Sequence, residues 1–216
     1  MKELPLNAIS GRGRRSGTVV LDTSFVTEWS QRYRNKLSRS KRTDEDALLG
    51  VVGPRVLERG YYTRSELHSV YRWKVPTQRN RHDIARNSTA EIKAVTKAAF
   101  SAPEGFQIHI LVGWLHGVSY AVASAFLMFP LPHVHTVIDY RAARALEVLY
   151  VSGQLPVRYL PWRPQPPDSG WSPPYPPYLD VCQTLAKHLA VGLRDLDRAL
   201  WRWHKEEMPT QTPELS

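Results

Sequence analysis

The sequence predicts an all-α fold, a helical bundle of two lobes built from short helices. Apolar residues recur at intervals of three and four along most of the chain, which is the period of a helix with one buried face. Several helix starts are marked by a Ser or Thr followed three residues later by Glu, the spacing of a capping box. Extended patterns are confined to residues 18–21 and 133–138. With 216 residues, 42% of them hydrophobic, the chain can bury a core without disulfides.

We expect three regions along the chain. Residues 1–21 form a flexible basic arm, because arginines and glycines alternate there. Residues 22–205 form the helical domain, and residues 206–216 form a tail. Inside the domain, residues 153–177 hold nine prolines, too many for a helix, and several aromatic residues, too many for an inert linker. We expect this segment to be an ordered loop packed across the surface.

The first predicted helix begins at Asp22. Its apolar stripe consists of Phe25, Val26, Trp29, Tyr33 and Leu37. Its outer face and the segment behind it are basic, with Arg32, Lys36, Arg39, Lys41 and Arg42. Clustered cations favour sequence-independent contact with phosphates, because each neutralised phosphate releases counterions. We expect these five residues, and Arg141 further along the chain, to contact the phosphate backbone of a nucleic acid.

Three capping boxes predict the next helix starts, at Thr63, Ser88 and Ser101, each followed by its Glu. The predicted stripes behind them are Leu67, Val70, Tyr71 and Lys74, then Ile92, Val95, Ala99 and Phe100, then Phe106, Ile110 and Trp114. These intervals predict three short connected helices.

The second half of the chain predicts three further helices. Ser119 can cap a helix that ends before Pro130, and Asp139 opens the next one. The buried side of that next helix is predicted to be Ala142, Ala145, Leu146 and Leu149. A long last helix starts near Tyr178 and is bent or broken at Gly192.

Charge and cysteine content narrow the function classes. The net charge is +9, and the first hundred residues carry 20 Lys and Arg against 10 Asp and Glu. This positive charge favours binding to nucleic acid or to an anionic membrane surface. The alternative is that the charge serves only to keep the protein soluble. The lone Cys182 excludes an intramolecular disulfide and a four-cysteine iron–sulfur site. No apolar run reaches the roughly 18 residues of a membrane span, and no signal-peptide core is present. We expect a soluble, monomeric, cytoplasmic protein, associated with the nucleoid if it is bacterial.

One local pattern points to a specific family. Leu115-His116-Gly117-Val118-Ser119 is followed by Ala123, and Asp139 comes 22 residues after Gly117. Over about residues 114–145 this pattern resembles the helix-hairpin-helix DNA glycosylases, the superfamily of endonuclease III and of the adenine-mismatch and alkyladenine enzymes. Their hairpin runs Leu-Pro-Gly-Val-Gly, and a Val-Asp pair follows later. His116 and Ser119 depart from that pattern.

The resemblance implies roles for these residues. Backbone amides of Gly117, Val118, Ser119 and Tyr120 would hold a DNA phosphate, with an alkali ion as a common companion at such a turn. Asp139 would be the catalytic carboxylate that assists departure of a flipped base; its other role is that of an ordinary helix N-cap. Ala121 stands where relatives with lyase activity carry a lysine, so a simple hydrolase is implied, although Lys74 can substitute. No organic cofactor is implied.

A base pocket and a metal site are weaker candidates. Tyr71, Trp73, Lys74 and Gln78 are the densest group of side chains that stack on a base or read its edge. Core packing is the alternative for Tyr71 and Trp73. His133 and His135 lie two apart on an extended segment and would point the same way, as metal ligands or as phosphate contacts, but no third ligand is evident.

The sequence therefore predicts a monofunctional DNA N-glycosylase that acts on a damaged, mismatched or modified base in double-stranded DNA. Two alternatives remain. One is a non-catalytic helix-hairpin-helix DNA-binding protein, and the other is a helical interaction protein whose basic arm binds RNA or a membrane surface.

Overall fold

The structure is a computed structural model that describes residues 19–75, 77, 81–155, 160–162 and 174–208. Within these ranges all regular secondary structure is helical, which confirms the all-α prediction. The elements are α1 (Thr23–Lys36), α2 (Arg39–Ala47), the π-helical turn η1 (Leu48–Val52), α3 (Gly53–Arg59), α4 (Arg64–Lys74), α5 (Arg81–Ala85), α6 (Thr89–Ser101), α7 (Glu104–Trp114), α8 (Tyr120–Met128), α9 (Tyr140–Val151), α10 (Tyr175–His188) and α11 (Leu193–Glu207). Most of the predicted arm and tail, residues 1–18 and 209–216, lies outside the described residues.

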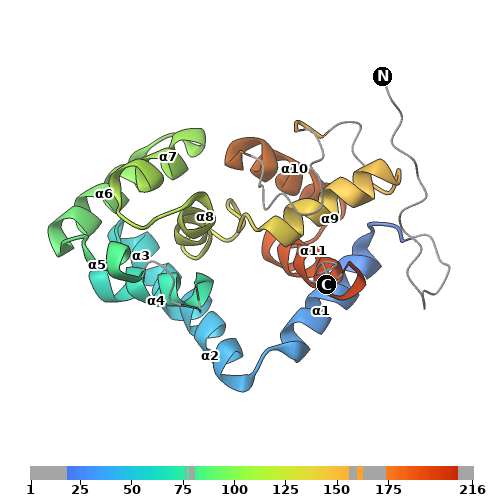
Figure 1. Cartoon of the computed structure of the whole chain (residues 1–216), viewed down its shortest axis with the longest axis horizontal. Coiled ribbons are helices and arrows are strands. Elements are labelled where there is room, and N and C mark those ends of the chain that lie inside the picture. Colours follow the sequence, from blue (N-terminus) through green and yellow to red (C-terminus); the bar gives the residue numbers. More distant parts are fainter. Residues whose placement is uncertain (1–18, 76, 78–80, 156–159, 163–173, 209–216) are drawn as a thin grey trace, which may run out of the picture.

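The helices form two groups (Figure 1). Helices α3 to α8 make up the first lobe, and α1 with α9, α10 and α11 makes up the second lobe. The chain passes between the lobes twice, through α2 and through residues 129–139. Elements from both ends of the chain therefore build the second lobe.

Aromatic packing joins α1 to α11 in the second lobe. Phe25 meets Trp203 edge-on at 5.7 Å between ring centroids, and Tyr33 meets Trp201 at 5.6 Å. The described part of the proline-rich loop also packs on this lobe, because Trp162 is buried and donates its indole N–H to Glu147 at 3.2 Å. Residues 160–162 of the predicted loop therefore pack on this lobe, and residues 156–159 and 163–173 lie outside the described residues.

Helix α8 is the centre of the first lobe, since every residue from Val122 to Met128 is buried. The Tyr62 hydroxyl donates to the carbonyl of Phe126 at 2.9 Å, inside this core. Gly53 lies so close to the end of α8 that a Cβ there would be 2.1 Å from the carbonyl oxygen of Phe129. Only glycine permits this approach.

Two of the three predicted capping boxes are confirmed. Thr63 and Ser88 each accept from the backbone three residues on, and the Glu of each box bonds back to the cap. The third prediction is wrong: Ser101 is the last residue of α6, its hydroxyl donates to the carbonyl of Lys97, and α7 starts after Pro103. The fixed φ of proline makes the helix start there without a side-chain cap.

The predicted stripe of α7 is also wrong. Phe106 and Trp114 are 66% and 75% exposed, and the buried face consists of Gln107, Ile108 and Leu111. Helix α7 is apolar on nearly every side, so its sequence period does not single out one face. Its contacts with α6 and α8 decide which side is covered.

The predicted break in the last helix is confirmed. Helix α10 ends at His188, Ala190 adopts a positive φ of 52°, and Gly192 is the N-cap of α11. Helix α10 starts at Tyr175, slightly before the predicted position, because prolines are tolerated in a first helical turn.

Candidate functional site

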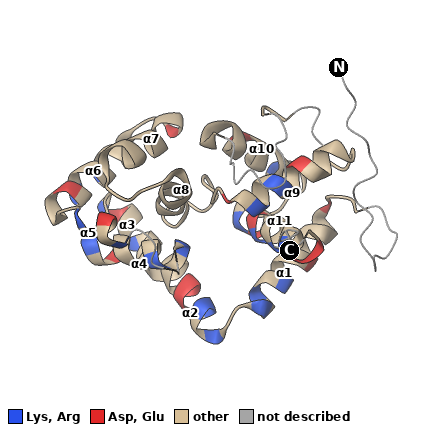
Figure 2. Cartoon of the chain, viewed as in Figure 1, with Lys and Arg blue, Asp and Glu red and all other residues tan. Residues whose placement is uncertain are grey.

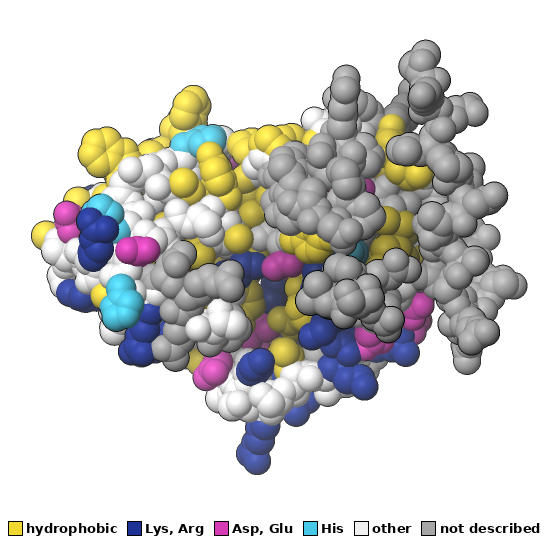
Figure 3. Space-filling view, viewed as in Figure 1, with side chains coloured by type: hydrophobic (Ala, Val, Ile, Leu, Met, Phe, Trp, Pro, Cys, Tyr) yellow, Lys and Arg dark blue, Asp and Glu magenta, His cyan; other side chains and the backbone are white. Residues whose placement is uncertain are grey.

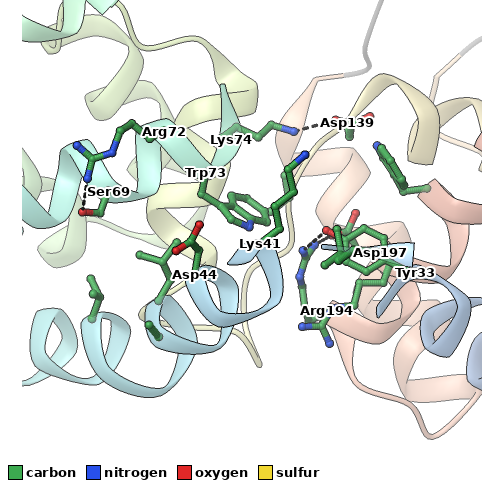
Figure 4. A pocket seen from close by; sticks show the side chains of 17 residues that line it. Tyr33, Lys41, Asp44, Ser69, Arg72, Trp73, Lys74, Asp139, Arg194 and Asp197 are labelled. Atoms are coloured by element: carbon green, nitrogen blue, oxygen red, sulfur yellow. Dashed lines mark hydrogen bonds and ion pairs between the residues drawn. The ribbon is translucent and has the colours of Figure 1, made fainter. Parts of the chain in front are cut away.

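A cavity of about 650 Å³ lies where the two lobes meet, and a hollow is visible there in Figure 3. Its polar and aromatic lining is shown in Figure 4 and comes from four parts of the chain. These residues are Tyr33, Lys41 and Asp44 from α1 and α2, Ser69, Arg72, Trp73 and Lys74 from α4, Asp139 before α9, and Arg194, Asp197, Arg198 and Trp201 from α11. The cavity is thus shared between lobes.

Asp139 presents its carboxylate to this cavity. As the N-cap of α9 it accepts from the backbone N–H of Arg141 at 3.0 Å, and its second oxygen accepts from Lys74 Nζ at 2.8 Å. Burial acts to raise the pKa of Asp139, but the charge and hydrogen bond of Lys74 outweigh it and lower that pKa below its usual range. Asp139 is therefore ionised at neutral pH. It is the N-cap of α9, one of the two roles considered for it, and its carboxylate also lines the cavity.

Buried hydrogen bonds fix the segment that leads to Asp139. The N–H of Ile138 donates to Ser124 Oγ at 3.0 Å, which ties the segment to α8. From α10, the hydroxyls of Tyr175 and Tyr178 donate to the carbonyls of Thr136 and Val137. Residues 133–138, which we call the strap, thus form an irregular segment that is hydrogen-bonded to both lobes, and they do not form a sheet strand.

Lys74 is the last residue of α4, and its side chain is only 12% exposed. The preceding Trp73 packs edge-on against Phe129 at 4.9 Å. Across the cavity, the guanidinium of Arg194 lies 5.1 Å from the Trp73 ring centroid. An indole and an ammonium from the first lobe therefore face the carboxylate and the guanidinium of the second lobe.

A buried charge cluster closes one side of the cavity. Glu45 Oε1 accepts from Arg194 at 2.8 Å and from Arg198 at 2.7 Å, and Arg194 also pairs with Asp197. Burial acts to raise the pKa of Glu45, and the two guanidiniums lower it below its usual range. Burial raises the pKa of Asp197 to about 6, although Arg194 opposes this. The cluster joins α2 to α11 at the boundary of the lobes.

The turn between α7 and α8 lines a second groove, of about 610 Å³. Gly117 has a φ of +71°, and a Cβ there would lie 2.7 Å from the backbone nitrogen of Ile84 in α5. The turn therefore requires glycine for two reasons, its backbone conformation and this close approach. Ser119 caps α8 as predicted, accepting from the N–H of Val122 at 3.4 Å.

The backbone amides of this turn have no hydrogen-bond acceptor within the described ranges. Among the described residues, none accepts a hydrogen bond from the N–H groups of residues 117–120. Such groups at a helix start suit an anion. An alkali ion at this turn would need its carbonyl oxygens, and one of these, that of His116, already accepts from Asn87 at 3.0 Å.

The predicted site residues fall into two places. Asp139, Trp73, Lys74 and Lys41 share the interlobe cavity. The turn residues Gly117, Val118 and Ser119, together with Tyr71, line the second groove instead. The α7–α8 turn and Asp139 therefore line different hollows, and the last turn of α4 contributes residues to both. Gln78 lies outside the described residues.

Most of the predicted basic residues lie around the junction of α1 and α2 (Figure 2). Lys36, Arg39 and Lys41 are exposed there, and Arg42 is half-exposed. Arg32, by contrast, pairs with Glu206 at 3.4 Å and lies over the Trp29 ring. Arg141 is half-buried beside Asp139, at the start of α9.

The two histidines of the strap do not share a face. His133 is exposed, whereas His135 is buried with its Nδ1 3.2 Å from the Tyr175 hydroxyl. The expected common direction is wrong because residues 132–134 form a turn and not a strand. In the described ranges, no group of three or more His, Cys, Asp or Glu side chains could hold a metal ion.

Sequence reasoning missed several residues of these sites, among them Asn87, Arg194 and Asp197. The two charged residues carried a signal, since they fall among the apolar positions that define the buried face of the last helix. A charge on such a face needs a buried partner. Asn87 carried no such signal, because an Asn just before a helix looks like ordinary loop sequence.

No family model matches this chain, and neither the curated proteins nor the solved structures include a significant match. No helix within the described ranges has the length and apolar character needed to cross a bilayer.

Proposed function

We propose that the protein is a monofunctional DNA glycosylase of the helix-hairpin-helix superfamily. It hydrolyses the N-glycosidic bond of a damaged, mismatched or modified base flipped out of double-stranded DNA. The observation that carries the proposal is the ionised carboxylate of Asp139 inside an aromatic-lined cavity between two helical lobes. The all-helical fold and the glycine turn at α7–α8 agree with it.

The chemistry needs a fixed negative charge. Breaking the glycosidic bond passes through a cation-like sugar, which a preorganised carboxylate stabilises most in a site of low dielectric. Asp139 is held by α9 and by Lys74, and its side chain is 27% exposed, enough for a ligand in the cavity to reach it. The same oxygens can orient the attacking water.

The cavity suits an extruded nucleoside. About 650 Å³ lies within the usual range of small-molecule sites, roughly 300–1,000 Å³. Tyr33, Trp73 and Trp201 supply aromatic surface for stacking, and Ser69 and Arg72 supply polar groups for a base edge. Tyr71, in the other groove, drops out of this pocket.

Contact with the duplex backbone would come from two surfaces. The free amides of the α7–α8 turn suit one phosphate, at a distance along the strand from the flipped nucleotide. The exposed cations Lys36, Arg39 and Lys41 lie beside the cavity on the α1–α2 junction. Together they would hold the strand on both sides of the extruded base.

The test is base release by Asp139→Asn. Duplexes carrying single lesions or mismatches are incubated with the protein, and abasic products are exposed by alkaline cleavage. Wild-type protein should release at least one base, and Asp139→Asn should reduce the rate by about 100-fold or more with little change in duplex affinity. Asn is also a good N-cap, so the helix start is kept. Asp180→Asn, at an exposed position on α10, is the matched control.

Other results separate the alternatives. Tight duplex binding by wild-type protein without release of any base would identify a non-catalytic DNA-binding protein. Base release that is unchanged in Asp139→Asn would remove Asp139 from the reaction.

A further inference from the structure

The Lys74–Asp139 pair places an ammonium and a carboxylate 2.8 Å apart within the cavity (Figure 4). A bare ammonium beside a sugar that becomes positive would oppose glycosidic cleavage. The same reaction, however, also creates a negative charge, on the departing base. An ion pair whose negative end faces the sugar and whose positive end faces the base matches this charge separation.

The charge of the cavity favours a base that is neutral before it leaves. Five Lys or Arg side chains and three Asp side chains line it. Glu45 adds one buried negative charge behind Arg194 and Arg198, and the balance stays positive. A purine alkylated at N3 or N7, which carries a positive charge in the nucleoside, would be repelled there.

This inference rests on the function proposed above. We propose that Lys74 donates a proton to the departing base. The substrates are neutral bases that are deaminated, oxidised or mismatched, and cationic alkylated purines are not substrates. The C1′–N bond breaks with its electron pair passing to the base nitrogen, which takes a proton from Lys74 Nζ. Water adds to C1′ and gives up a proton through Asp139, and that proton restores the Lys74 ammonium. The products are the free base and an abasic sugar.

Neighbouring cations are poorer candidates for this role. Arg194 directs its donors to Glu45 and Asp197, and a guanidinium does not give up a proton in proteins. Lys41 is exposed on α2. Lys74 alone among the cavity lysines contacts Asp139 in the described structure.

The experiment compares Lys74→Met and Lys74→Arg with wild-type protein under single-turnover conditions. The rates measured are those of release of uracil, hypoxanthine and 8-oxoguanine from duplexes. Release of 7-methylguanine from a duplex is measured alongside. Wild-type protein should release at least one of the three neutral bases faster than 7-methylguanine. Both variants should release that base about 100-fold more slowly, because arginine keeps the charge but cannot transfer the proton. Any release of 7-methylguanine, which leaves as a neutral base and needs no proton, should not fall.

Rates for two bases on one preparation give a ratio that is independent of the folded fraction, so a poorly folding variant still yields a result. Lys97→Met, at an exposed position on α6, is the control and should leave the rates unchanged. Near wild-type rates in Lys74→Arg would overturn proton donation. Release of 7-methylguanine alone would overturn the substrate class and leave the proposed function standing.

Two further outcomes complete the test. A borohydride-trapped DNA adduct that disappears in Lys74→Arg would make Lys74 a nucleophile, which overturns its role as proton donor and the monofunctional assignment. Wild-type protein that releases none of the four bases, and none in the wider lesion panel, would overturn the proposed function and this inference with it.

Discussion

Asn87 binds both backbone polar groups of His116. Its Oδ1 accepts from the His116 N–H at 2.9 Å, and its Nδ2 donates to the His116 carbonyl at 3.0 Å. The same Nδ2 donates to the carbonyl of Ile84 at 2.9 Å. One buried amide therefore joins the end of α5 to the turn that precedes α8, and fixes the turn that we propose holds a phosphate.

Asn87→Ala should destabilise the protein and weaken duplex binding together. The change removes the partner of the part-buried N–H and carbonyl of His116 and leaves the Ile84 carbonyl with only the backbone N–H of residue 87, which should lower the free energy of unfolding by about 2 kcal/mol in urea titrations. Asn87→Asp can still accept from the N–H of His116 but cannot donate to the carbonyls. Its free energy of unfolding should lie between those of wild-type protein and Asn87→Ala. Asn35→Ala, on the exposed surface of α1, is the control. Duplex affinity that stays constant in folded Asn87→Ala would argue against phosphate binding at the turn.

Glu45→Gln should be among the most destabilising single changes in the chain. Glu45 Oε1 accepts four hydrogen bonds from Arg194 and Arg198, all between 2.7 and 3.1 Å. Removing its charge leaves two buried guanidiniums short of negative charge, at a cost of about 3 kcal/mol. Urea unfolding measures the loss, with Glu58→Gln at an exposed position as the control. Asp195 also accepts from Arg198, at 2.9 Å, and a loss below 1 kcal/mol would show that Asp197 and Asp195 alone neutralise the cluster.

The sequence was most informative where local signals decide the structure. The capping boxes at Thr63 and Ser88, and the break near Gly192, lie where predicted because each depends on residues within one helical turn. The face of α7 could not be predicted, because long-range packing against α6 and α8 chooses among several apolar sides. Helix α2 and its π-helical passage into α3 were also missed, since α2 is strongly polar and shows no apolar stripe.

Only some of the residues that line the candidate site could be predicted from the sequence: Asp139, Trp73, Lys74 and Lys41 could, and the α11 residues could not. Asp139 was found from its spacing to Gly117, and the structure places it in a cavity. The partner role of Lys74 toward Asp139 depends on two segments 65 residues apart, which only the fold brings together. Arg194 and Asp197 enter the cavity for the same reason, because α11 packs beside α9.

Stability should fall as the pH drops from 6.5 toward 4. Burial lowers the pKa of both His135 and His204 to about 4, below the ordinary value of 6.5 that applies in the unfolded chain. Their neutral forms therefore favour folding above pH 6.5, and this contribution disappears as the pH falls through the folded-state pKa. The loss amounts to at most about 3 kcal/mol for each buried imidazole.

The measurement is the free energy of unfolding in urea at several pH values, for wild-type protein and for His135→Gln with His204→Gln. Asp197 acts in the opposite direction, because its pKa is raised to about 6 and its ionisation weakens the fold as the pH rises. The difference between the two proteins cancels this contribution. The double variant should show a smaller decline between pH 6.5 and 4.5, and equal declines would mean that these imidazoles are not buried in solution.

The salt dependence of duplex binding should report the basic junction of α1 and α2. Replacing Lys36, Arg39 and Arg42 by Gln should reduce the slope of log affinity against log salt concentration by about 2 to 3, because each lost phosphate contact removes about 0.9 from it. All three are at least half-exposed, so the fold should tolerate the change. Lys97→Gln with Lys187→Gln, on α6 and α10, removes exposed cations elsewhere and should leave the slope nearly unchanged. Equal slopes in the two variants would mean that the strand does not cross this junction, and that the phosphates are held by Arg141 and the α7–α8 turn instead.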